Sequence, residues 1–458
     1  MYQLRSYQEE AVKSARDAVT AGHRGIVIQS PPRTGKTVIM ADIARSATKQ
    51  CNRVLFIVHR AEILAQARET FRTDGVNMRF CQMGMVQTIT RHVDELKTPT
   101  IIIVDEAHHA LSRSYRKILD NFPQSVKLLF TATPWRMDGK GLDGVADTLI
   151  QGKPISWLMN NGFLAPVDYY APSGLDNSQL KTKRNGEFDE NSIEQAMKPK
   201  IYGDTVAHYQ KLAAGKQAIA YAYNVASAKR LADAFNAAGI TARSVSGKTK
   251  KKDRERIVAA YRAGKIQVVT NAELFTEGLD LPNVDCVIML RPTQSLSLYL
   301  QFAMRSMNPR EGKTAVIIDH VNNVERFGLP TIDRVWTLGG RDKHSKSSNG
   351  EPIKSVTVCP MCFATFYRHG DECPFCGALL TEEETIAVDP NAKLKKVEAD
   401  KRVALAKRLA EDRAMDAVAD KSPAELKTYA EIKAYGKLHG YKPGWAYFQA
   451  KLKGLIRK

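Results

Sequence analysis

Three sets of residues have the types and the spacing that chemistry needs. The first is a Gly-Lys-Thr sequence at 35–37, which ends the loop SPPRTGKT at 30–37. The second is an Asp-Glu pair at 105–106. The third is a group of four cysteines crowded between positions 359 and 376. The first two sets are suited to binding and hydrolysing a nucleoside triphosphate, and the third is typical of a metal site.

The loop at 30–37 is suited to a chain of phosphates. Its backbone N–H groups and the start of the following helix can surround phosphate oxygens. Lys36 would neutralise the β- and γ-phosphates, and Thr37 would ligate Mg²⁺. Ser30 stands where the first glycine of the usual G-x-x-x-x-G-K-[ST] pattern would be. The other residues predicted to bind the nucleotide here are Pro32, Arg33, Thr34 and Gly35.

The acidic pair supplies the second half of a hydrolytic site. It follows the apolar run TIIIV, so it stands at the end of an expected strand. Asp105 can hold Mg²⁺, and Glu106 can orient and deprotonate the attacking water. His108 is placed to report the state of the γ-phosphate to its surroundings. These residues predict that the chain uses ATP and Mg²⁺.

The cysteines form two CPxC pairs in a C-x₂-C-x₁₀-C-x₂-C pattern, made by Cys359, Cys362, Cys373 and Cys376. Such pairs can direct four thiolates at one Zn²⁺ in a tetrahedral site. Because the segment is too short for much of a core, the metal would hold it together. An iron–sulfur cluster is the less favoured alternative. Nearby residues could stack on bases or form the small core of the ribbon, namely Phe363, Phe366, Tyr367, Arg368 and His369.

Parallel strands are the elements that must position these loops. Apolar runs such as GIVIQS, VLFIVH, TIIIVD and KLLFTAT alternate with helical patterns, and a second series begins near residue 217. Near-continuous apolar strands separated by helices predict parallel α/β sheets that are covered on both faces. In such sheets ligands lie at the carboxyl ends of the strands, which is where both phosphate motifs fall.

The composition narrows the class of protein. The chain has 458 residues, of which 43% are hydrophobic, and a formal net charge of +19. This length allows two or three domains. The positive charge indicates a polyanionic partner, with a merely solubilising surface as the alternative. The uneven cysteine count favours a reducing compartment, and we expect neither a secretory signal nor a membrane span.

The C-terminal region is basic and aromatic. Residues 391–458 contain 17 Lys and Arg against 8 Asp and Glu. The stretch GYKPGWAYFQAKLKG interleaves cations with rings, which suits phosphate contacts and base stacking. The alternative is a helical hairpin that packs its rings internally and leaves its lysines solvated. The lysines expected to contact nucleic acid are Lys442, Lys451 and Lys453.

Several short motifs in residues 1–330 together resemble superfamily 2 nucleic-acid helicases and translocases of the DEAH type. The segment LRSYQ resembles the motif that reads adenine, which implies roles for Arg5 and Gln8. VHRAEILAQ at 58–66 and VQT at 86–88 resemble later motifs of the family. The implied nucleic-acid contacts are His59, Arg60, Gln87 and Thr88.

The resemblance extends to motifs further along the chain. TATP at 131–134 resembles the motif that couples the ATP state to the grip on the strand, which implies Thr131 and Thr133. EGLDLP at 277–282 resembles G-x-D-x-P, which implies that Gly278 and Asp280 lie at the nucleotide.

The last family motif, Q-x-x-G-R-x-x-R, supplies arginines that reach the γ-phosphate across a cleft. Here Gln301 and Arg305 match, whereas Met304 and Asn308 replace the glycine and the second arginine. We expect Arg305 to be the main arginine finger, with Arg310 as a substitute.

The resemblance predicts an α/β fold with two tandem RecA-like parallel-sheet domains, followed by a four-cysteine zinc ribbon and a basic helical tail. The expected boundaries are 1–165 for the ATP-binding domain, 166–205 for a linker or insertion, 206–340 for the second domain, 341–385 for the ribbon and 386–458 for the tail.

A two-domain motor with such a ribbon resembles RadD-like and related phage-encoded DNA helicases. This implies an ATP-dependent helicase or translocase that acts on single-stranded or branched DNA in replication, repair or recombination. The implied partners are DNA and single-strand-binding or recombination proteins, in the cytoplasm of a bacterium or of a phage-infected host, near the nucleoid. A catalytically slow ATP-binding DNA scaffold and an RNA helicase are the alternatives.

Overall fold

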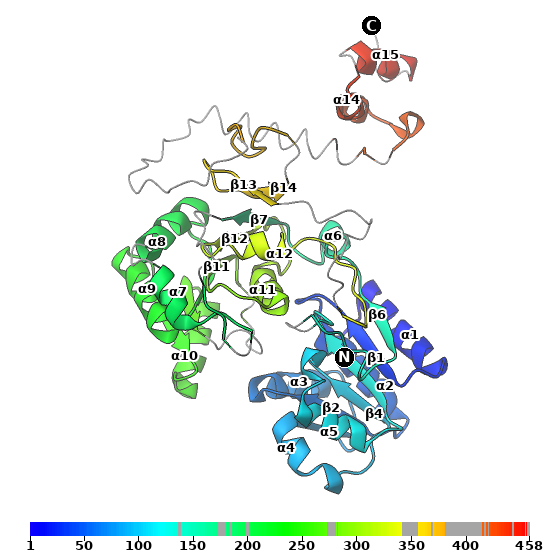
Figure 1. Ribbon diagram of the computed structural model, residues 1–458. Coiled ribbons are helices and arrows are strands. Elements are labelled where there is room, and N and C mark those ends of the chain that lie inside the picture. The colour runs from blue at the N-terminus through cyan, green and yellow to red at the C-terminus, as the bar shows by residue number, and fades with distance from the viewer. Residues whose placement is uncertain are drawn as a thin grey trace. The chain divides into compact units, whose positions relative to one another are not determined.

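The computed structural model (Figure 1) falls into two compact units, Met1–Val356 with Thr365–Tyr367, and Thr357–Ala364 with Arg368–Lys458. Its described residues are 1–135, 139–171, 180–183, 186–197, 201–272, 281, 283–340, 356–367, 370–380, 415, 418–419, 421–441, 444–453 and 455. The first unit contains two six-stranded sheets, and we call each sheet with its helices a domain.

The first sheet (blue to cyan in Figure 1) has the strand order β3-β2-β4-β5-β1-β6, and all its pairings are parallel. The strands are β1 (Gly25–Gln29), β2 (Val54–Val58), β3 (Cys81–Met85), β4 (Ile101–Val104), β5 (Val126–Thr131) and β6 (Thr148–Gln151). Four of them are the apolar runs that predicted a parallel sheet, so that prediction is confirmed.

Helices cover both faces of the first sheet because alternate strand residues point to opposite sides. They are α1 (Ser6–Thr20), α2 (Lys36–Lys49), α3 (Ala61–Thr73), α4 (Val86–Arg91) and α5 (Arg113–Asn121), with short 3₁₀ turns η1 (Val93–Glu95) and η2 (Ala107–His109). Phe56 faces the core that also contains Met40 and Phe71 of α2 and α3. Its neighbour Ile57 faces the opposite core.

The second sheet (green to yellow in Figure 1) has the order β7-β12-β11-β8-β10-β9 and is also parallel. Its strands are β7 (Val167–Tyr170), β8 (Ala218–Ala222), β9 (Ala242–Ser246), β10 (Val268–Ala272), β11 (Cys286–Leu290) and β12 (Ala315–Asp319). The helices are α7 (Glu190–Ala196), α8 (Ile201–Leu212), α9 (Val225–Ala237), α10 (Lys251–Arg262), α11 (Leu296–Ala303) and α12 (Asn323–Phe327), with the 3₁₀ turn η4 (Met304–Ser306). The helix α6 (Ile155–Asn160) lies between the two domains, because its Leu158 packs in one core with Tyr7 of α1 and Met304 of η4.

The segment 166–205, expected to be a linker, contributes structure of its own. Its first residues form β7, which pairs with β12 at the edge of the second sheet. It also contains α7 and the start of α8. The sheet therefore begins before the expected boundary at 206, because the short run VDYY gains its place only by pairing with a strand about 150 residues later.

The ribbon and tail supply the remaining elements. The strands β13 (Val356–Val358) and β14 (Thr365–Tyr367) form a two-stranded sheet. The tail has the 3₁₀ turn η5 (Pro423–Glu425) and the helices α14 (Tyr429–Leu438) and α15 (Gly444–Leu452). The hydroxyl of Thr428 caps α14, and a Cβ at Gly436 would lie 2.9 Å from the ring of Trp445, so only glycine allows the two helices to approach this closely.

None of the helices in the described ranges is both long and apolar enough to cross a bilayer.

Candidate ATP site and metal centre

The loop between β1 and α2 is closed by its own side chains. Thr34 Oγ1 donates to the carbonyl of Pro31 at 2.6 Å, and the Ser30 hydroxyl lies 2.7 Å from the same Thr34 oxygen. Since Thr34 donates its only proton to Pro31, Ser30 is the donor to Thr34. The departure from glycine at position 30 therefore supplies a hydroxyl that ties the two ends of the loop together.

Gly35 begins α2 in a left-handed conformation, with φ of 78°. This conformation favours glycine, and a Cβ at this position would lie 2.6 Å from Gln8 Nε2, so the Gln8 side chain would have to move. Gln8 Nε2 and the Tyr7 hydroxyl each donate to the carbonyl of Thr34 at 2.9 Å. Gln8 is 4% exposed, and its hydrogen bond stabilises the phosphate loop. This role is additional to the adenine contact expected from the sequence.

Lys36 reaches back over this loop. Its Nζ donates to the carbonyl oxygens of Ser30 at 3.2 Å and Pro31 at 3.5 Å. The ammonium group and the N–H groups at the start of α2 therefore meet at one place. This set of donors fits a chain of phosphates.

The acidic pair follows β4 on a strained stretch of backbone. Glu106 has φ of 51° and ψ of 52°, a left-handed conformation that is uncommon for a residue other than glycine. Its backbone N–H donates to Asp105 Oδ1 at 2.9 Å. Strain of this kind clusters at functional sites, where the surroundings hold a side chain in one direction.

Glu106 is ionised at neutral pH. Burial by itself raises the pKa of its carboxyl, but the contact with His108 and the charges of Lys36, His108 and His109 outweigh burial and lower that pKa. The contact joins His108 Nδ1 and Glu106 Oε2 at 3.4 Å. An ionised carboxylate at this place can accept a hydrogen bond from the attacking water, orient it and take up its proton.

Three imidazole rings connect the end of β2 with Glu106. The ring centroids of His59 and His109 are 4.9 Å apart, and those of His109 and His108 are 4.1 Å apart. Arg60 Nε donates to His59 Nε2 at 3.3 Å. His59, which is predicted to contact nucleic acid, is thus connected through His109 and His108 to the predicted catalytic residue Glu106. His109 was not among the predicted site residues.

The other two predicted strand contacts are exposed nearby. Gln87 and Thr88 lie at the start of α4, directly after β3, and both are exposed. Because β2 and β3 are paired and parallel, their carboxyl ends are adjacent. All four predicted nucleic-acid contacts of the first domain therefore lie on one edge of its sheet.

The predicted coupling segment 131–134 lies beside the phosphate loop. The carbonyl of Thr131 accepts from Ser30 N at 3.0 Å, and Gln29 Nε2 donates to the carbonyl of Ala132 at 3.0 Å. Thr133 N donates to the Thr131 hydroxyl at 3.1 Å, which closes a tight turn. This turn therefore cannot move without disturbing the end of β1.

The second domain presents Arg305 on η4, directly after α11, with 8% of the residue exposed. Arg33 of the phosphate loop donates to the carbonyl of Leu281 at 3.4 Å and so reaches this domain. Burial raises the pKa of Tyr221, and the positive charges of Arg305 and Arg33 both act to lower that pKa, because both guanidinium groups lie near its ring. Gln301 is half-buried on α11, and Gly278 and Asp280 lie outside the described residues.

The two departures in this motif have structural reasons. Met304 is fully buried in a core with Tyr7 and Leu158, so its side chain fills space that glycine would leave empty. Asn308 Oδ1 accepts from Lys313 Nζ at 2.7 Å. Arg310 pairs with Asp285, just before β11 and therefore at the amino end of that strand.

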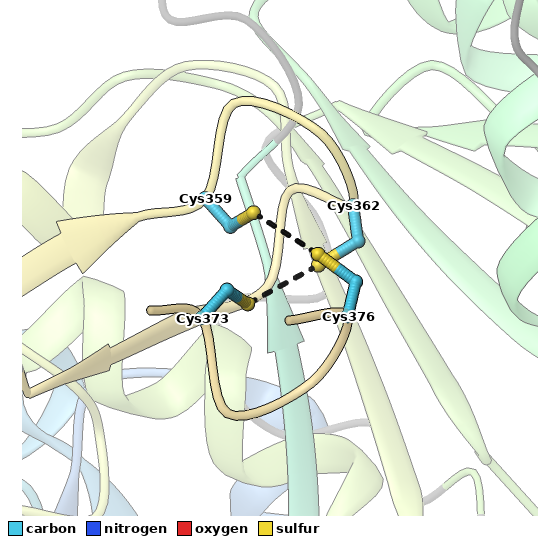
Figure 2. Close-up of side chains that lie close together, drawn as sticks. All are labelled: Cys359, Cys362, Cys373 and Cys376. Atoms are coloured by element: carbon cyan, nitrogen blue, oxygen red, sulfur yellow. Dashed lines mark hydrogen bonds between the residues drawn. The ribbon is translucent and has the colours of Figure 1, made fainter. Parts of the chain in front are cut away.

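The four cysteines of the CPxC pairs point toward one another (Figure 2), with all their Sγ atoms within 4.8 Å. Two of the separations are 3.5 Å, between Cys359 and Cys376, and 3.7 Å, between Cys362 and Cys373. A tetrahedral Zn²⁺ with Zn–S distances of about 2.3 Å would separate its sulfurs by about 3.8 Å. Backbone N–H groups two residues after Cys359 and Cys373 donate to those thiols at 3.4 Å. The cluster fits one zinc ion.

The aromatic residues of the ribbon and the lysines of the tail differ in their environments. Phe366 is 9% exposed, which favours the interpretation as core, and Arg368 and His369 lie outside the described residues. Lys453 Nζ donates to the carbonyls of Pro423, Ala424 and Leu426 at 2.6, 2.9 and 2.9 Å. Its ammonium group is therefore used within the tail and not offered to phosphates as expected. Lys451 is exposed, and Lys442 lies outside the described residues.

Comparisons with known proteins agree with this geometry. Residues 1–95 and 77–136 match the family model "Type III restriction enzyme, res subunit", and residues 201–309 match "Helicase conserved C-terminal domain". The "51.5 kDa protein" of Lactococcus phage (isolate 7-9) is 39% identical over 361 residues, which cover 78% of this chain and 79% of that protein. "Putative ATP-dependent helicase IRC3" of Saccharomyces cerevisiae is 27% identical over 364 residues, which cover 72% of this chain but only 52% of that protein.

A solved structure shares the fold. The fragment described as an HsdR subunit of a type I restriction enzyme from Vibrio vulnificus YJ016 has a TM-score of 0.58 and 21% identity, and the match covers 77% of this chain and 70% of that one. Two parallel-sheet domains with a phosphate loop and an acidic pair define the class of ATP-hydrolysing, nucleic-acid-dependent motors.

The chain belongs to superfamily 2 of the helicases, in the same family as the 51.5 kDa phage protein. ATP and a nucleic acid are accordingly the substrates of its class. The match spans about half the length of the yeast relative, so the properties of that whole protein do not carry over to this chain.

Proposed function

We propose that this chain is an ATP-dependent DNA helicase or translocase whose hydrolytic site is formed by Lys36, Glu106 and Arg305. One observation carries the proposal. The Glu106 carboxylate is held ionised near Lys36 and His108, at the strand ends beside the phosphate loop. A buried, ionised carboxylate next to a phosphate-binding lysine is the arrangement that ATP hydrolysis requires.

Each residue of the proposed site would have a separate role in ATP hydrolysis. Lys36 and the N–H groups of the loop bind and orient the phosphates, while Glu106 orients the attacking water and accepts its proton. Arg305 neutralises charge on the γ-phosphate from the second domain. Thr37 and Asp105 would hold Mg²⁺, which supplies further positive charge when bound.

We expect Arg305→Ala to lower kcat for ATP hydrolysis by about 10³-fold, because an arginine finger contributes 10³–10⁵ in rate. Arg310→Ala should change kcat by less than about threefold, because Arg310 is engaged with Asp285 in a partly exposed ion pair, which contributes little. Steady-state ATPase measurements on the two purified variants compare them directly. A normal rate for Arg305→Ala together with an inactive Arg310→Ala would show that the finger is Arg310.

The expected response to nucleic acid rests on the strand edge that carries His59, Arg60, Gln87 and Thr88, whereas the preference for DNA over RNA rests on the resemblance alone. We expect single-stranded DNA to raise the ATPase rate at least about tenfold, because the ring contacts join this edge to Glu106. The assay compares single-stranded, forked and duplex DNA with RNA at one salt concentration, since phosphate contacts make the affinity depend on salt. Stimulation by RNA alone would favour an RNA helicase, and slow ATPase without any stimulation would favour a DNA-binding scaffold.

The setting of this activity stays a proposal that rests on the resemblance to RadD-like and phage helicases. We place it in replication, repair or recombination, with single-strand-binding or recombination proteins as partners. The zinc ribbon and Lys451 of the tail are proposed as further contacts to DNA, and Lys453 is left out because its donors are used within the tail.

A further inference from the structure

After α12 the chain leaves the second domain and lies along the first. We call residues 332–340 the strap. In the strap, the Asp333 carboxylate accepts from the backbone N–H of Ser156 at 3.0 Å and from its hydroxyl. The Gln151 side chain donates to the carbonyl of Arg334 at 3.1 Å and accepts from the N–H of Trp336 at 3.3 Å. The strap is therefore bonded to β6 and to the first turn of α6.

The end of the strap lies directly on the backbone of the first domain. The carbonyl of Leu338 accepts from Leu142 N at 2.8 Å and from Asp143 N at 3.2 Å. A Cβ at Gly141 would lie 1.8 Å from that carbonyl oxygen and 2.3 Å from Gly340 N. Only glycine at position 141 permits this approach, so the seat is shaped for the strap and is not an incidental contact.

The strap is also anchored in the second domain. Arg334 Nη2 donates to the carbonyl of Phe327, the last residue of α12, at 2.9 Å, and to that of Leu329 at 3.4 Å. One short segment is thus bonded to both domains.

A tryptophan pair joins the strap to the coupling segment. The ring centroids of Trp336 and Trp135 are 4.7 Å apart at 64°, an edge-to-face arrangement. Trp135 Nε1 donates to the carbonyl of Thr337 at 2.9 Å. Trp135 directly follows the segment 131–134, whose turn is bonded to the end of β1 beside the phosphate loop.

Trp336 of this pair lies beside α11, the helix that directly precedes Arg305. A cavity of about 20 Å³ is lined by residues of the phosphate loop, the coupling segment, the strap and α11, among them Pro31, Ala132, Leu300, Arg334 and Trp336. Four parts of the chain that the proposed function requires to move together therefore meet around Trp336.

We propose that the strap couples the 131–135 segment to the second domain, and that Trp336 is the positioning residue through which this coupling acts. The inference rests on the proposed function. When hydrolysis shifts the 131–135 segment against β1, Trp135 moves the strap, and Arg334 passes the movement to α12. Trp336 lies outside the predicted nucleotide and strand contacts, so its effect is on the coupling of hydrolysis to movement.

We would test this with Trp336→Ala and with Gly141→Ala, which blocks the seat of the strap. Trp336→Phe keeps a ring, and Gly144→Ala is the matched control because a Cβ there lies 3.4 Å from Leu111 Cδ2, which is ordinary contact. Expected for both disruptive variants is a fall of about fivefold or more in DNA translocated or unwound per ATP, with ATP KM and basal kcat within about twofold. Trp336→Phe and Gly144→Ala should stay near wild type.

Thermal unfolding of each variant shows whether it is folded. If Trp336→Ala does not fold, Gly141→Ala tests the inference in its place. Unchanged yield of movement per ATP in folded Trp336→Ala or Gly141→Ala would overturn the inference. A second measurement needs no turnover. A non-hydrolysable ATP analogue with single-stranded DNA should shift the tryptophan emission of the wild type, and Trp336→Phe should lose at least about half of that shift.

Different results would contradict the proposed function and the role of the strap. A wild-type chain that binds no ATP, or binds it without hydrolysis, would remove the proposed function. A chain that hydrolyses ATP and responds to DNA, with the same emission shift in wild type and Trp336→Phe, would remove only the role of the strap.

Discussion

Replacing Glu106 by glutamine should lower kcat for ATP hydrolysis by about 10²- to 10⁴-fold, the range that general acid–base groups contribute. The amide keeps the shape of the side chain but cannot accept the proton of the attacking water. ATP binding should persist, because Lys36 and the loop at 30–35 are unchanged. Steady-state ATPase with DNA present, and titration of a fluorescent ATP analogue, measure the two quantities separately.

Controls for Glu106 come from the same domain. Glu95→Gln removes an exposed carboxylate of η1 that contacts His92, and its ATPase should equal that of the wild type. Lys36→Ala should lose both binding and turnover, because it removes the main positive charge of the loop. Normal turnover in Glu106→Gln would contradict the assignment of the catalytic residue. Since the pKa of Glu106 is lowered, its ionisation should not limit the rate until the pH falls far below neutral.

Removal of the metal should unfold the ribbon, because the apparent binding free energy of structural Zn²⁺ sites is about 10–16 kcal/mol and the segment has little other core. We expect about one Zn²⁺ per chain in the purified protein and almost none in Cys373→Ser. Metal analysis of the two proteins measures the loss, and near-UV circular dichroism reports the change of structure.

The matched control for the metal is Cys51→Ser, which removes an exposed cysteine far from the quartet in sequence and should keep the zinc. Full zinc content in Cys373→Ser would exclude the four-thiolate site. Iron and a visible absorption band in the wild type would instead identify an iron–sulfur cluster.

The arginine motif shows how a departure from a family pattern can be compensated. Met304 replaces a glycine by filling a core that also contains Tyr7, and Asn308 replaces an arginine by accepting from Lys313. Neither change disturbs Arg305, which stays buried at the end of α11. The two substitutions are therefore weak support for an inactive scaffold.

The sequence by itself determined the features that are local. The apolar runs predicted most of the strands of both parallel sheets but not β3, β6 or β7, because only a strand buried on both faces is apolar along its whole length. The order of the loops after those strands predicted which residues share an edge. The spacing of the cysteines predicted a cluster that fits one zinc ion, because two CPxC pairs need only short turns to bring four sulfurs together.

Only the tertiary structure decided the features that depend on contacts between distant residues. Ser156 meets Asp333 and Trp135 meets Thr337 across 177 and 202 positions. β7 gains its place from β12, and Lys453 uses its donors on carbonyls some 30 residues earlier. No local pattern of hydrophobicity encodes such pairs, because it can show that a side chain is buried but not which distant residue covers it. For this reason the sequence did not predict the strap. The only local indication was Trp135, a large ring directly after the predicted coupling segment.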